Sequence, residues 1–294
     1  MDIFLTLVTP PAHENTLRQV VADLEGILTG AKTIWLSDGV AVDLVLPPAD
    51  IAELEKIVQT RIAEQPIDFL CGPVTGRRKK LLIADMDSTF VTSETLDDMA
   101  AHVGLKDEIT AITARSMRGE LDFEASVRER VKMIAGMSVS AVLETLSKVE
   151  LTSGAQELAR TMRHHGAYTA LVSGGFTLFT EKIYRWCNFH EHRSNVLGIS
   201  DGKLTGDIDG AIVGREAKRE ALDELCGRHG LGRGDALTIG DGANDLDMIE
   251  AAGLGIAYYG KPMLADAARA NIRHTDLKTA LYYQGYDDTE IVMI

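Results

Sequence analysis

The sequence has few cysteines and no pair of them at the spacing of a metal site. Only 3 of its 294 residues are cysteines, and none of them forms a C-x-x-C pair. This pattern indicates neither a zinc site nor a disulfide framework, and it favours a reducing, cytoplasmic compartment. No apolar run reaches the ~18 residues that span a bilayer, and the N-terminus lacks the charged-then-apolar pattern of a signal peptide. We therefore expect a soluble cytoplasmic protein that does not bind a membrane.

Positive charge is also scarce. Lysine and arginine number 30 against 44 aspartate and glutamate residues, which gives a net charge of −14. An acidic surface disfavours binding along a nucleic-acid backbone, although a locally positive pocket can still bind an anionic small molecule. We therefore expect no nucleic-acid partner and interpret the basic run at residues 77–80 as a solvated linker. The P-loop motif is absent, so P-loop kinase chemistry has no support, and the H-E-x-x-H motif is absent as well.

The first part of the chain predicts a small domain. Its length of 294 residues suggests about two domains. Within residues 1–75, short apolar runs alternate with stretches whose apolar residues have helical spacing. The runs predict strands at 3–8, 34–36, 40–46 and 67–70, and the stretches predict helices at 17–28 and 51–62. This β-α-β-β-α-β order is the split arrangement of a ferredoxin-like α+β domain.

The remainder, residues 76–294, alternates strands and helices. Four apolar runs are continuous, as strands buried on both faces tend to be; they cover residues 81–84, 168–172, 236–239 and 254–258. The helical stretches between them predict an α/β fold with a parallel sheet covered by helices. About eighty residues separate the first two runs, which is more than one crossover helix needs. We therefore expect a helical cap inserted at about residues 95–160.

Polar segments follow three of these runs directly. They are Asp85-Met86-Asp87-Ser88-Thr89, Ser173-Gly174-Gly175 and Gly240-Asp241-Gly242-Ala243-Asn244-Asp245. Ligands of open parallel sheets bind beyond the carboxyl ends of the strands, so the three segments should converge at one edge. Asp85 and Asp87 lie two residues apart and face the same way if the chain is still extended. Several carboxylates this close repel one another unless a cation lies among them, and oxygen ligands of this kind suit Mg²⁺.

Such a site is suited to phosphoryl transfer. A metal lets a carboxylate approach an anionic phosphate and attack phosphorus, which gives an acyl phosphate. The Ser173 hydroxyl and the Gly174 amide can bind phosphate oxygens. Lys218, at the start of a predicted helix, can neutralise charge that develops in the transition state. Each feature alone has an ordinary explanation as a loop, a turn or a solvated lysine; together, in this order, they indicate a phosphoryl-transfer site.

With Lys218, the three segments resemble the four motifs of the haloacid dehalogenase superfamily of Mg²⁺-dependent phosphatases. The resemblance extends over about residues 79–281 and implies a Rossmann-like parallel sheet with an inserted helical cap. Residues 116–123 and 126–131 resemble the cap of the phosphoserine phosphatase family. Glu94 also falls where that family has a substrate-binding glutamate. The implied activity is Mg²⁺-dependent hydrolysis of O-phospho-L-serine to serine and phosphate, the last step of L-serine biosynthesis.

The resemblance also implies roles for the motif residues. Asp85 is then the nucleophile that becomes an aspartyl phosphate, and Asp87 is the general acid and, in the second step, the general base. Mg²⁺ is expected on Asp85, Asp241 and the backbone carbonyl of Asp87, with Asp245 supporting the metal site or Lys218. The residues expected around the phosphoryl group are Ser173, Gly174, Lys218 and Asn244.

The cap residues then match the rest of O-phosphoserine, which carries an ammonium and a carboxylate besides its phosphate. Glu94 can pair with the ammonium, and Arg128 can bind the carboxylate with its planar guanidinium. Met117 and Phe123 can form an apolar wall that excludes water when the cap closes. Taken without the family, Arg128 fits a row of solvated charges, and Met117 and Phe123 fit the cap's own core.

The N-terminal unit resembles an ACT-type regulatory domain in its element order. ACT domains often place a glycine in the loop after the first strand, but here residues 9–15 contain none. Amino-acid binding, a homodimer contact and a purely structural role therefore all stay open for this unit.

Two further interpretations of the catalytic unit also stay open. One is transfer of the phosphoryl group to a small alcohol such as homoserine, or action on another phosphorylated small molecule. The other is a non-catalytic amino-acid sensor built on the same scaffold. Against the sensor stands the joint presence of four residues that catalysis needs, namely Asp85, Asp87, Lys218 and Asp241.

Overall fold

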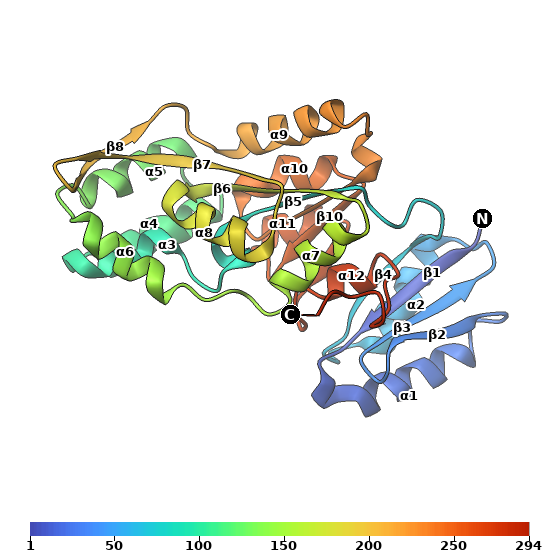
Figure 1. Cartoon of the computed structure of the whole chain (residues 1–294). Coiled ribbons are helices and arrows are strands. Elements are labelled where there is room, and N and C mark those ends of the chain that lie inside the picture. Colours follow the sequence, from blue (N-terminus) through green and yellow to red (C-terminus); the bar gives the residue numbers. More distant parts are fainter. Residues whose placement is uncertain (294) are drawn as a thin grey trace.

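A computed structural model describes residues 1–293, so Ile294, the end of the expected second unit, lies outside it. The chain forms two sheets (Figure 1): a four-stranded antiparallel sheet from the first 73 residues and a seven-stranded sheet that begins at Leu81. Among the described residues, no helix combines the length and the apolar character needed to cross a membrane.

The N-terminal sheet has the strand order β2-β3-β1-β4. Its elements are β1 (Ile3–Val8), α1 (Glu14–Glu25), β2 (Lys32–Ser37), β3 (Ala41–Leu46), α2 (Ile51–Ile62) and β4 (Asp68–Pro73). The Asp50 carboxylate caps α2 by accepting hydrogen bonds from the amides of Ala52 and Glu53. Apolar side chains of both helices pack with those of the strands in one core. The predicted ferredoxin-like order is confirmed, while the likeness to an ACT domain stays a prediction.

The larger sheet has the strand order β11-β10-β9-β5-β6-β7-β8. Its central strands are the four predicted apolar runs, paired in parallel: β5 (Leu81–Ala84), β6 (Tyr168–Phe176), β9 (Ala236–Gly240) and β10 (Leu254–Tyr258). Side chains of β5 alternate between two apolar clusters, with Leu81 and Ile83 in one and Leu82 and Ala84 in the other. Helices therefore cover both faces of the sheet, and the predicted fold class is confirmed.

The helices of this core lie on opposite sides of the sheet. One cluster takes in side chains of α7 (Ala155–His164), α8 (Thr177–Cys187) and α12 (Thr279–Tyr282). The other takes in side chains of α9 (Arg215–Arg228), α10 (Leu246–Ala251) and α11 (Pro262–Ala267).

Three further strands of this sheet were not predicted. They are β7 (Glu191–Ser200), β8 (Lys203–Asp209) and β11 (Ala270–Ile272). In β8 every second side chain is buried, and β7 is only partly buried, so neither contains a continuous apolar run. Strand β8 pairs antiparallel with β7 and is the edge strand of an otherwise parallel sheet.

The inserted cap consists of four helices. They are α3 (Thr95–Ala100), α4 (Lys106–Met117), α5 (Phe123–Met133) and α6 (Val139–Lys148). The two segments that connect the cap to the core pair with each other at Val91 and Leu151. The expected cap range of about 95–160 extended too far, because α7 packs on α8 and β6 and so belongs to the core.

The β7–β8 hairpin reaches from the core to the cap (Figure 1). Leu204 of β8 exchanges backbone hydrogen bonds with the turn that follows α5: its carbonyl accepts from the Gly136 amide, and its amide donates to the Met137 carbonyl, each at 2.8 Å. The cap is therefore attached to the core through this hairpin as well as through its two connecting segments.

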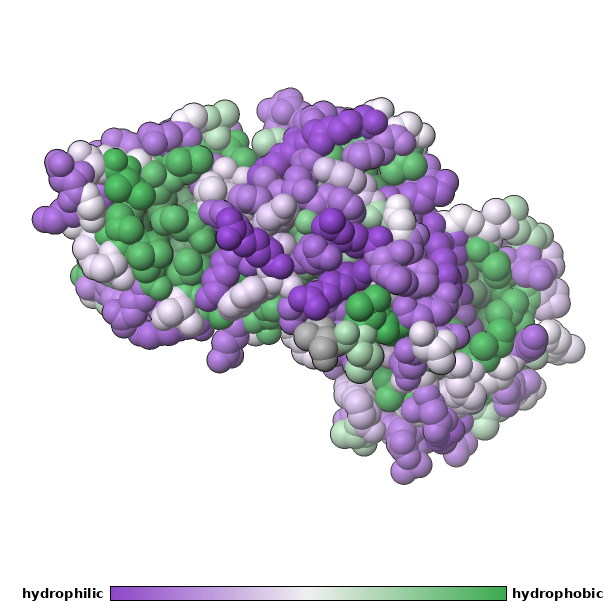
Figure 2. All heavy atoms as spheres, in the orientation of Figure 1, coloured by the Kyte–Doolittle hydropathy of each residue, from purple (hydrophilic) through white to green (hydrophobic). Residues whose placement is uncertain are grey.

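The surface differs between the ends and the middle of the molecule. On the face drawn in Figure 2, hydrophobic residues gather over the cap and over the N-terminal domain, while hydrophilic residues dominate between them. Large apolar side chains that are exposed come from separate elements, such as Ile34 of β2, Leu143 of α6 and Ile199 of β7.

The basic run at residues 77–80 does not behave as a fully solvated linker. The Arg77 side chain is only 10% exposed, and its guanidinium forms a two-pronged ion pair with Asp43 of β3, with N–O distances of 2.5 and 2.8 Å. It also donates to the carbonyls of Tyr282 and Tyr283 at the end of the chain's last helix. The ring of Phe4 lies 3.8 Å from the guanidinium carbon. Arg77 therefore joins the N-terminal sheet to the core, which corrects the linker interpretation at this residue.

We expect Arg77→Ala to lower the free energy of unfolding by ~3 kcal/mol or more, because it leaves the buried Asp43 carboxylate without its cation. Urea denaturation measures this difference. The matched control is Arg18→Ala, which removes an exposed ion pair with Asp38 and should cost less than ~1 kcal/mol. Equal, small losses in both variants would contradict the structural role given to Arg77.

Candidate active site

The three predicted polar segments meet at the carboxyl edge of the large sheet. Asp85 directly follows β5, Ser173 lies near the end of β6, and Asp241 directly follows β9. Core residues Asp85, Asp87, Ser173, Gly174 and Asn244 line a cavity beneath the cap, and the cap side supplies Glu94, Met117, Phe123, Val127 and Arg130. All but one of the side chains predicted to bind the substrate therefore line one cavity or lie beside it.

Lys218 is the central cation of this edge. Its side chain is fully buried at the start of α9, and Nζ lies 2.8 Å from Oδ1 of Asp85 and 2.7 Å from Oδ1 of Asp245. Burial alone would lower the pKa of Lys218, but the negative charges of Asp245 and Asp85 raise it above its ordinary value. Lys218 is therefore a permanent positive charge held against Asp85.

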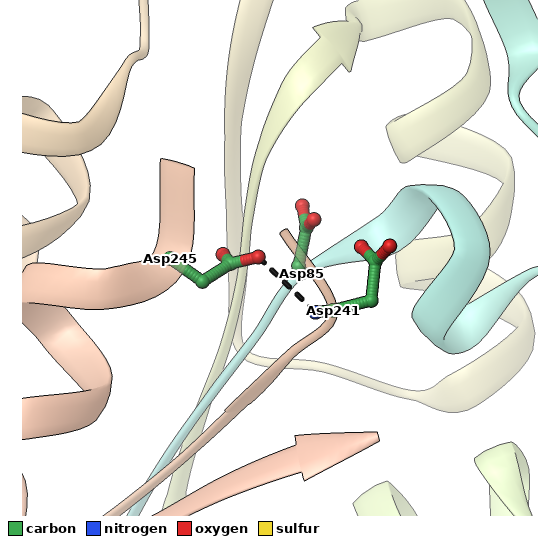
Figure 3. A group of neighbouring side chains, drawn as sticks. All are labelled: Asp85, Asp241 and Asp245. Carbon is green, nitrogen blue, oxygen red and sulfur yellow. Dashed lines mark hydrogen bonds between the residues drawn. The ribbon is translucent and has the colours of Figure 1, made fainter. Parts of the chain in front are cut away.

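Asp245 connects this lysine to the loop that carries Asp241. Its second oxygen accepts hydrogen bonds from the backbone amides of Asp241 and Gly242, both at 3.2 Å. Burial raises the pKa of Asp245 to about 6, while Lys218 acts in the opposite direction. Figure 3 shows its carboxylate turned toward the backbone of Asp241. Both of its oxygens are thus occupied by protein donors, which fits a supporting role.

Asp85, Asp241 and Asp245 bring carboxylate oxygens within 4.8 Å of one another. Asp241 is 2% exposed, and neither of its carboxylate oxygens accepts a hydrogen bond from any described residue. Burial, with the nearby charges of Glu94, Asp245 and Asp85, raises the pKa of Asp241 well above its usual range. In Figure 3 the carboxylates of Asp85 and Asp241 extend to the same side. Buried carboxylate oxygens without donors fit a divalent cation.

A tight turn at residues 86–90 positions two further residues of the site, Asp87 and Glu94. Ser88 has a φ of 52°, in the left-handed region that non-glycine residues seldom adopt. Its hydroxyl donates to the Glu94 carboxylate at 2.8 Å, and the Asp87 carboxylate accepts from the Thr95 amide at 3.0 Å. The turn therefore fixes Asp87 and Glu94 relative to each other at the start of the cap.

Both of these carboxyl groups hold their protons unusually tightly. Burial, followed by the charges of Glu94 and Asp85, raises the pKa of Asp87 well above its usual range. Burial also raises the pKa of Glu94 to about 7. A carboxyl group with a raised pKa, such as that of Asp87, can donate a proton to a leaving group.

Small residues shape the last part of β6, after Val172, where its pairing with β7 shifts register. The Ser173 hydroxyl accepts a hydrogen bond from the Gly175 amide at 2.9 Å. A Cβ atom on Gly175 would lie 2.6 Å from Oδ2 of Asp87, so only glycine allows this approach. The amide of Asn195 in β7 donates to the Gly174 carbonyl at 2.7 Å, and its oxygen accepts from the Val213 amide at 2.8 Å.

Asn195 was missed in the sequence, since a single asparagine within an unpredicted strand carries no local signal. Asn244, by contrast, was predicted from its motif. The structure places it in the cavity wall with a buried side-chain oxygen that has no partner among the described residues.

The cap lies closed on the core. A Cβ atom on Gly174 would lie 2.6 Å from the ring tip of Phe123, and one on Gly242 would lie 2.6 Å from the sulfur of Met117. The cavity left between them has a volume of about 20 Å³, close to what one water molecule needs. Phe123 therefore lies against Gly174, and Met117 lies against Gly242; their role as an apolar wall stays a prediction.

The structure corrects the prediction for Arg128. This residue is exposed, whereas Arg130, two positions later, is 3% exposed and lines the cavity. The reason is the helical repeat: Phe123, Val127 and Arg130 share one face of α5, and Arg128 lies about 100° from Val127 around the helix. Spacing from Phe123 at i+4 and i+7 was the signal that could have identified Arg130.

Comparison with known proteins agrees with this geometry. A model of the haloacid dehalogenase-like hydrolases matches residues 82–250, more than half of the chain. The chain belongs to this family. The matched range contains Asp85, the cap and Asp241, so the cavity lies within the part that defines these hydrolases.

Relatives of this hydrolase carry one recurrent name. The phosphoserine phosphatase of Methanocaldococcus jannaschii is 37% identical over 207 residues, which is 70% of this chain and 98% of that protein. The phosphoserine phosphatase of Streptomyces coelicolor is 37% identical over 253 residues, or 85% of this chain. The present chain spans 62% of the length of that longer relative.

A solved structure resembles this hydrolase over nearly its whole length. A haloacid dehalogenase family hydrolase of Salmonella enterica superimposes with a TM-score of 0.83 at 27% identity. The match covers 98% of this chain and 99% of the Salmonella chain. The N-terminal sheet and the catalytic unit thus occur together in both proteins.

We expect Lys218→Met to lower the free energy of unfolding by ~3 kcal/mol or more, because two buried carboxylates lose their cation. Urea denaturation in the presence of EDTA measures this, since no divalent cation can then compensate. Arg219→Met on the same helix is the control. Arg219 pairs with Asp223 at the surface, and its loss should cost less than ~1 kcal/mol. A Lys218 variant as stable as this control would contradict the central place given to Lys218.

Proposed function

We propose that this protein hydrolyses O-phospho-L-serine to L-serine and phosphate. One observation carries the proposal: a single cavity is lined by Asp85 and Ser173 of the core and by the Glu94 carboxylate and the Arg130 guanidinium of the cap side. These groups are complementary to a phosphate, an ammonium and a carboxylate on one small molecule. The relatives named phosphoserine phosphatase support the same substrate.

In the first step, an oxygen of Asp85 attacks phosphorus and the bond from phosphorus to the serine oxygen breaks, which gives an aspartyl phosphate. Asp87 donates its proton to the departing serine oxygen, a role that fits its raised pKa. In the second step Asp87 takes a proton from water, whose oxygen attacks phosphorus and returns the free Asp85 carboxylate with inorganic phosphate. Lys218 holds Asp85 in place through the 2.8 Å ion pair.

The cation that these residues fit is Mg²⁺. Asp85, Asp241 and the backbone carbonyl of Asp87 would hold it, and it would supply positive charge that offsets the phosphate oxygens. Asp245 is engaged by Lys218 and two backbone amides, so it supports this set.

Residues around the phosphoryl group act as donors. The Ser173 hydroxyl and the Gly174 amide bind its oxygens, and the Asn244 side chain lies in the same wall. Asn195 fixes the peptide between Gly174 and Gly175 by donating to the Gly174 carbonyl. Preorganised donors of this kind stabilise the transition state without a reorganisation cost.

Cap residues recognise the amino-acid part. Glu94 pairs with the ammonium, and Arg130, rather than Arg128, binds the carboxylate. Met117 and Phe123 close the cavity and exclude bulk water.

We also infer a cytoplasmic location, because all three cysteines are free and buried in the structure, a state that a reducing compartment maintains. A homodimer stays a prediction, as does any ligand of the N-terminal domain.

Phosphate release tests the proposed function. We expect wild-type protein to release phosphate from O-phospho-L-serine only with Mg²⁺, and to prefer it over phosphosugars, phosphothreonine and homoserine phosphate. Added homoserine should leave the rate of phosphate release unchanged. Asp85→Asn, measured beside the wild type, should abolish turnover while the fold stays intact by circular dichroism, because an amide cannot serve as the nucleophile.

Other outcomes of this experiment point elsewhere. Mg²⁺-dependent preference for a different compound would keep the catalytic residues and reject the substrate. Turnover by Asp85→Asn would reject the nucleophile. No activity on any compound, from folded protein, would favour the amino-acid sensor.

The correction at Arg128 gives a second test. We expect Arg130→Ala to lower kcat/KM for O-phospho-L-serine by roughly 30-fold or more, because the carboxylate of the substrate loses its buried guanidinium partner. Arg128→Ala, on the exposed face of the same helix, should change it less than about 2-fold. With p-nitrophenyl phosphate, which has no carboxylate, Arg130→Ala should lose far less. Equal losses from the two arginine variants would contradict the placement of Arg130 against the substrate.

A further inference from the structure

Arg130 is held by a chain of hydrogen bonds that crosses three cap helices. Its Nη1 donates to the hydroxyl of Thr113 in α4 at 2.7 Å, and that hydroxyl donates to Oδ1 of Asp97 in α3 at 2.7 Å. Its Nε donates to the Ser126 carbonyl, one turn earlier in α5, at 3.2 Å. Arg130 and Thr113 are 3% exposed and Asp97 is 5% exposed, so these bonds form away from solvent.

The direction of each bond in this chain is fixed. A guanidinium only donates, so the Thr113 oxygen must accept from Arg130, and its single proton is then left for Asp97. Asp97 in turn is a carboxylate that accepts. The threonine hydroxyl therefore has one orientation. Because it donates to the Asp97 carboxylate, its oxygen becomes a stronger acceptor for Nη1 of Arg130.

Placing a hydroxyl between the two charges has a geometric effect. A direct two-pronged pair with Asp97 would occupy the planar edge that a substrate carboxylate needs. In the structure, Thr113 and Ser126 take Nη1 and Nε, and no described residue accepts a hydrogen bond from Nη2. Arg130 lines the same cavity as Glu94. Two nitrogens of the guanidinium are thus held by cap residues, and Nη2 keeps its donor capacity.

Acidic side chains around Arg130 compensate the charge of its buried guanidinium. Burial lowers the pKa of Arg130, and the negative charges of Glu94, Asp97 and Asp87 oppose that shift. Glu94 and Asp87 belong to the cavity, whereas Asp97 lies behind Thr113. Asp97 is therefore an acidic side chain that stabilises the buried guanidinium without lining the cavity.

We propose that Thr113 and Asp97 are positioning residues that fix the edge of Arg130 facing the cavity, and thereby set the preference for a phosphate monoester that also carries a carboxylate. The inference rests on the proposed function, since it concerns recognition of the carboxylate of O-phosphoserine. A purely structural role for the two residues would instead stabilise the cap and affect all substrates alike.

A pair of substrates separates these two roles. O-Phosphoethanolamine has the phosphate and the ammonium of O-phosphoserine but no carboxylate. We expect Thr113→Val, which keeps the shape and removes the hydroxyl, to raise KM for O-phospho-L-serine roughly 10-fold or more, as expected for a lost hydrogen bond to a charged group. The KM for O-phosphoethanolamine divided by the KM for O-phospho-L-serine should therefore fall, because the variant no longer recognises the carboxylate as well as the wild type does. We call this quotient the KM ratio.

Two further variants serve as controls. Thr113→Ser keeps the hydroxyl and should restore the wild-type KM ratio to within about 3-fold. Thr145→Val removes another buried cap hydroxyl, which bonds His102 and lies outside the cavity lining, and it should leave the ratio unchanged. Asp97→Asn keeps a side-chain oxygen for Thr113 but removes the charge, and it should shift the ratio in the same direction as Thr113→Val.

Each alternative outcome is distinct. If Thr113→Val raises both KM values equally, or if Thr113→Ser does not restore the ratio, the positioning role is wrong and the two residues act only in cap stability. If wild-type protein turns over O-phosphoserine and Thr113→Val leaves its KM unchanged, only this inference fails. If wild-type protein shows no turnover of O-phosphoserine, the proposed function fails and this inference fails with it.

Discussion

The ion contact of Lys218 with Asp85 and Asp245 is the constraint on which the catalytic edge depends. Three aspartates with oxygens within 4.8 Å repel one another in a buried site, and Lys218 is the buried cation that contacts two of them. Asp245 extends this contact through its second oxygen to the amides of Asp241 and Gly242. One lysine thus sets the position of loops that follow two different strands.

The carboxylates that Lys218 does not contact determine which ions the site can bind. Asp241 keeps two buried oxygens without donors, and Asp87 and Glu94 hold protons more tightly than usual because of burial. Positive charge is therefore in deficit at this edge, as in the whole chain, whose net charge is −14. In the proposed function, a divalent cation would offset this deficit locally, and the phosphate group of the substrate would add negative charge for Lys218 and the backbone donors to bind.

Much of this arrangement could be predicted from the sequence. The central strands were visible because sheets covered on both faces need continuous apolar runs, as at residues 81–84 and 236–239. The polar segments at their ends, with Asp85, Ser173 and Asp241, then had to lie at one edge by the geometry of parallel strands. Local information was sufficient for these features, since each depends on a strand and the few residues after it.

The features that were missed depend on long-range contacts or on helical phase. Arg128 and Arg130 differ by two positions in one charged segment, and only the helical repeat of α5 decides which of them is buried. Asn195 acquires its role from bonds to Gly174 and Val213, 21 and 18 residues away. Arg77 was interpreted from the composition of its neighbours, whereas its burial depends on Asp43 and on the other end of the chain. The β7–β8 hairpin was not predicted because β8 buries only every second side chain and β7 is only partly buried.

The position of Arg77 also has a consequence for the order in which the chain folds. Its partner Asp43 is 34 residues away, but the carbonyl of Tyr283 is 206 residues away. During synthesis, the N-terminal sheet and Arg77 are complete long before the last helix of the core exists. Contacts between segments so far apart form late because their loop-closure entropy is paid only when the intervening chain is compact. The ion pair with Asp43 can therefore assemble early, while the bonds to the last helix join the two domains only after the large sheet has formed.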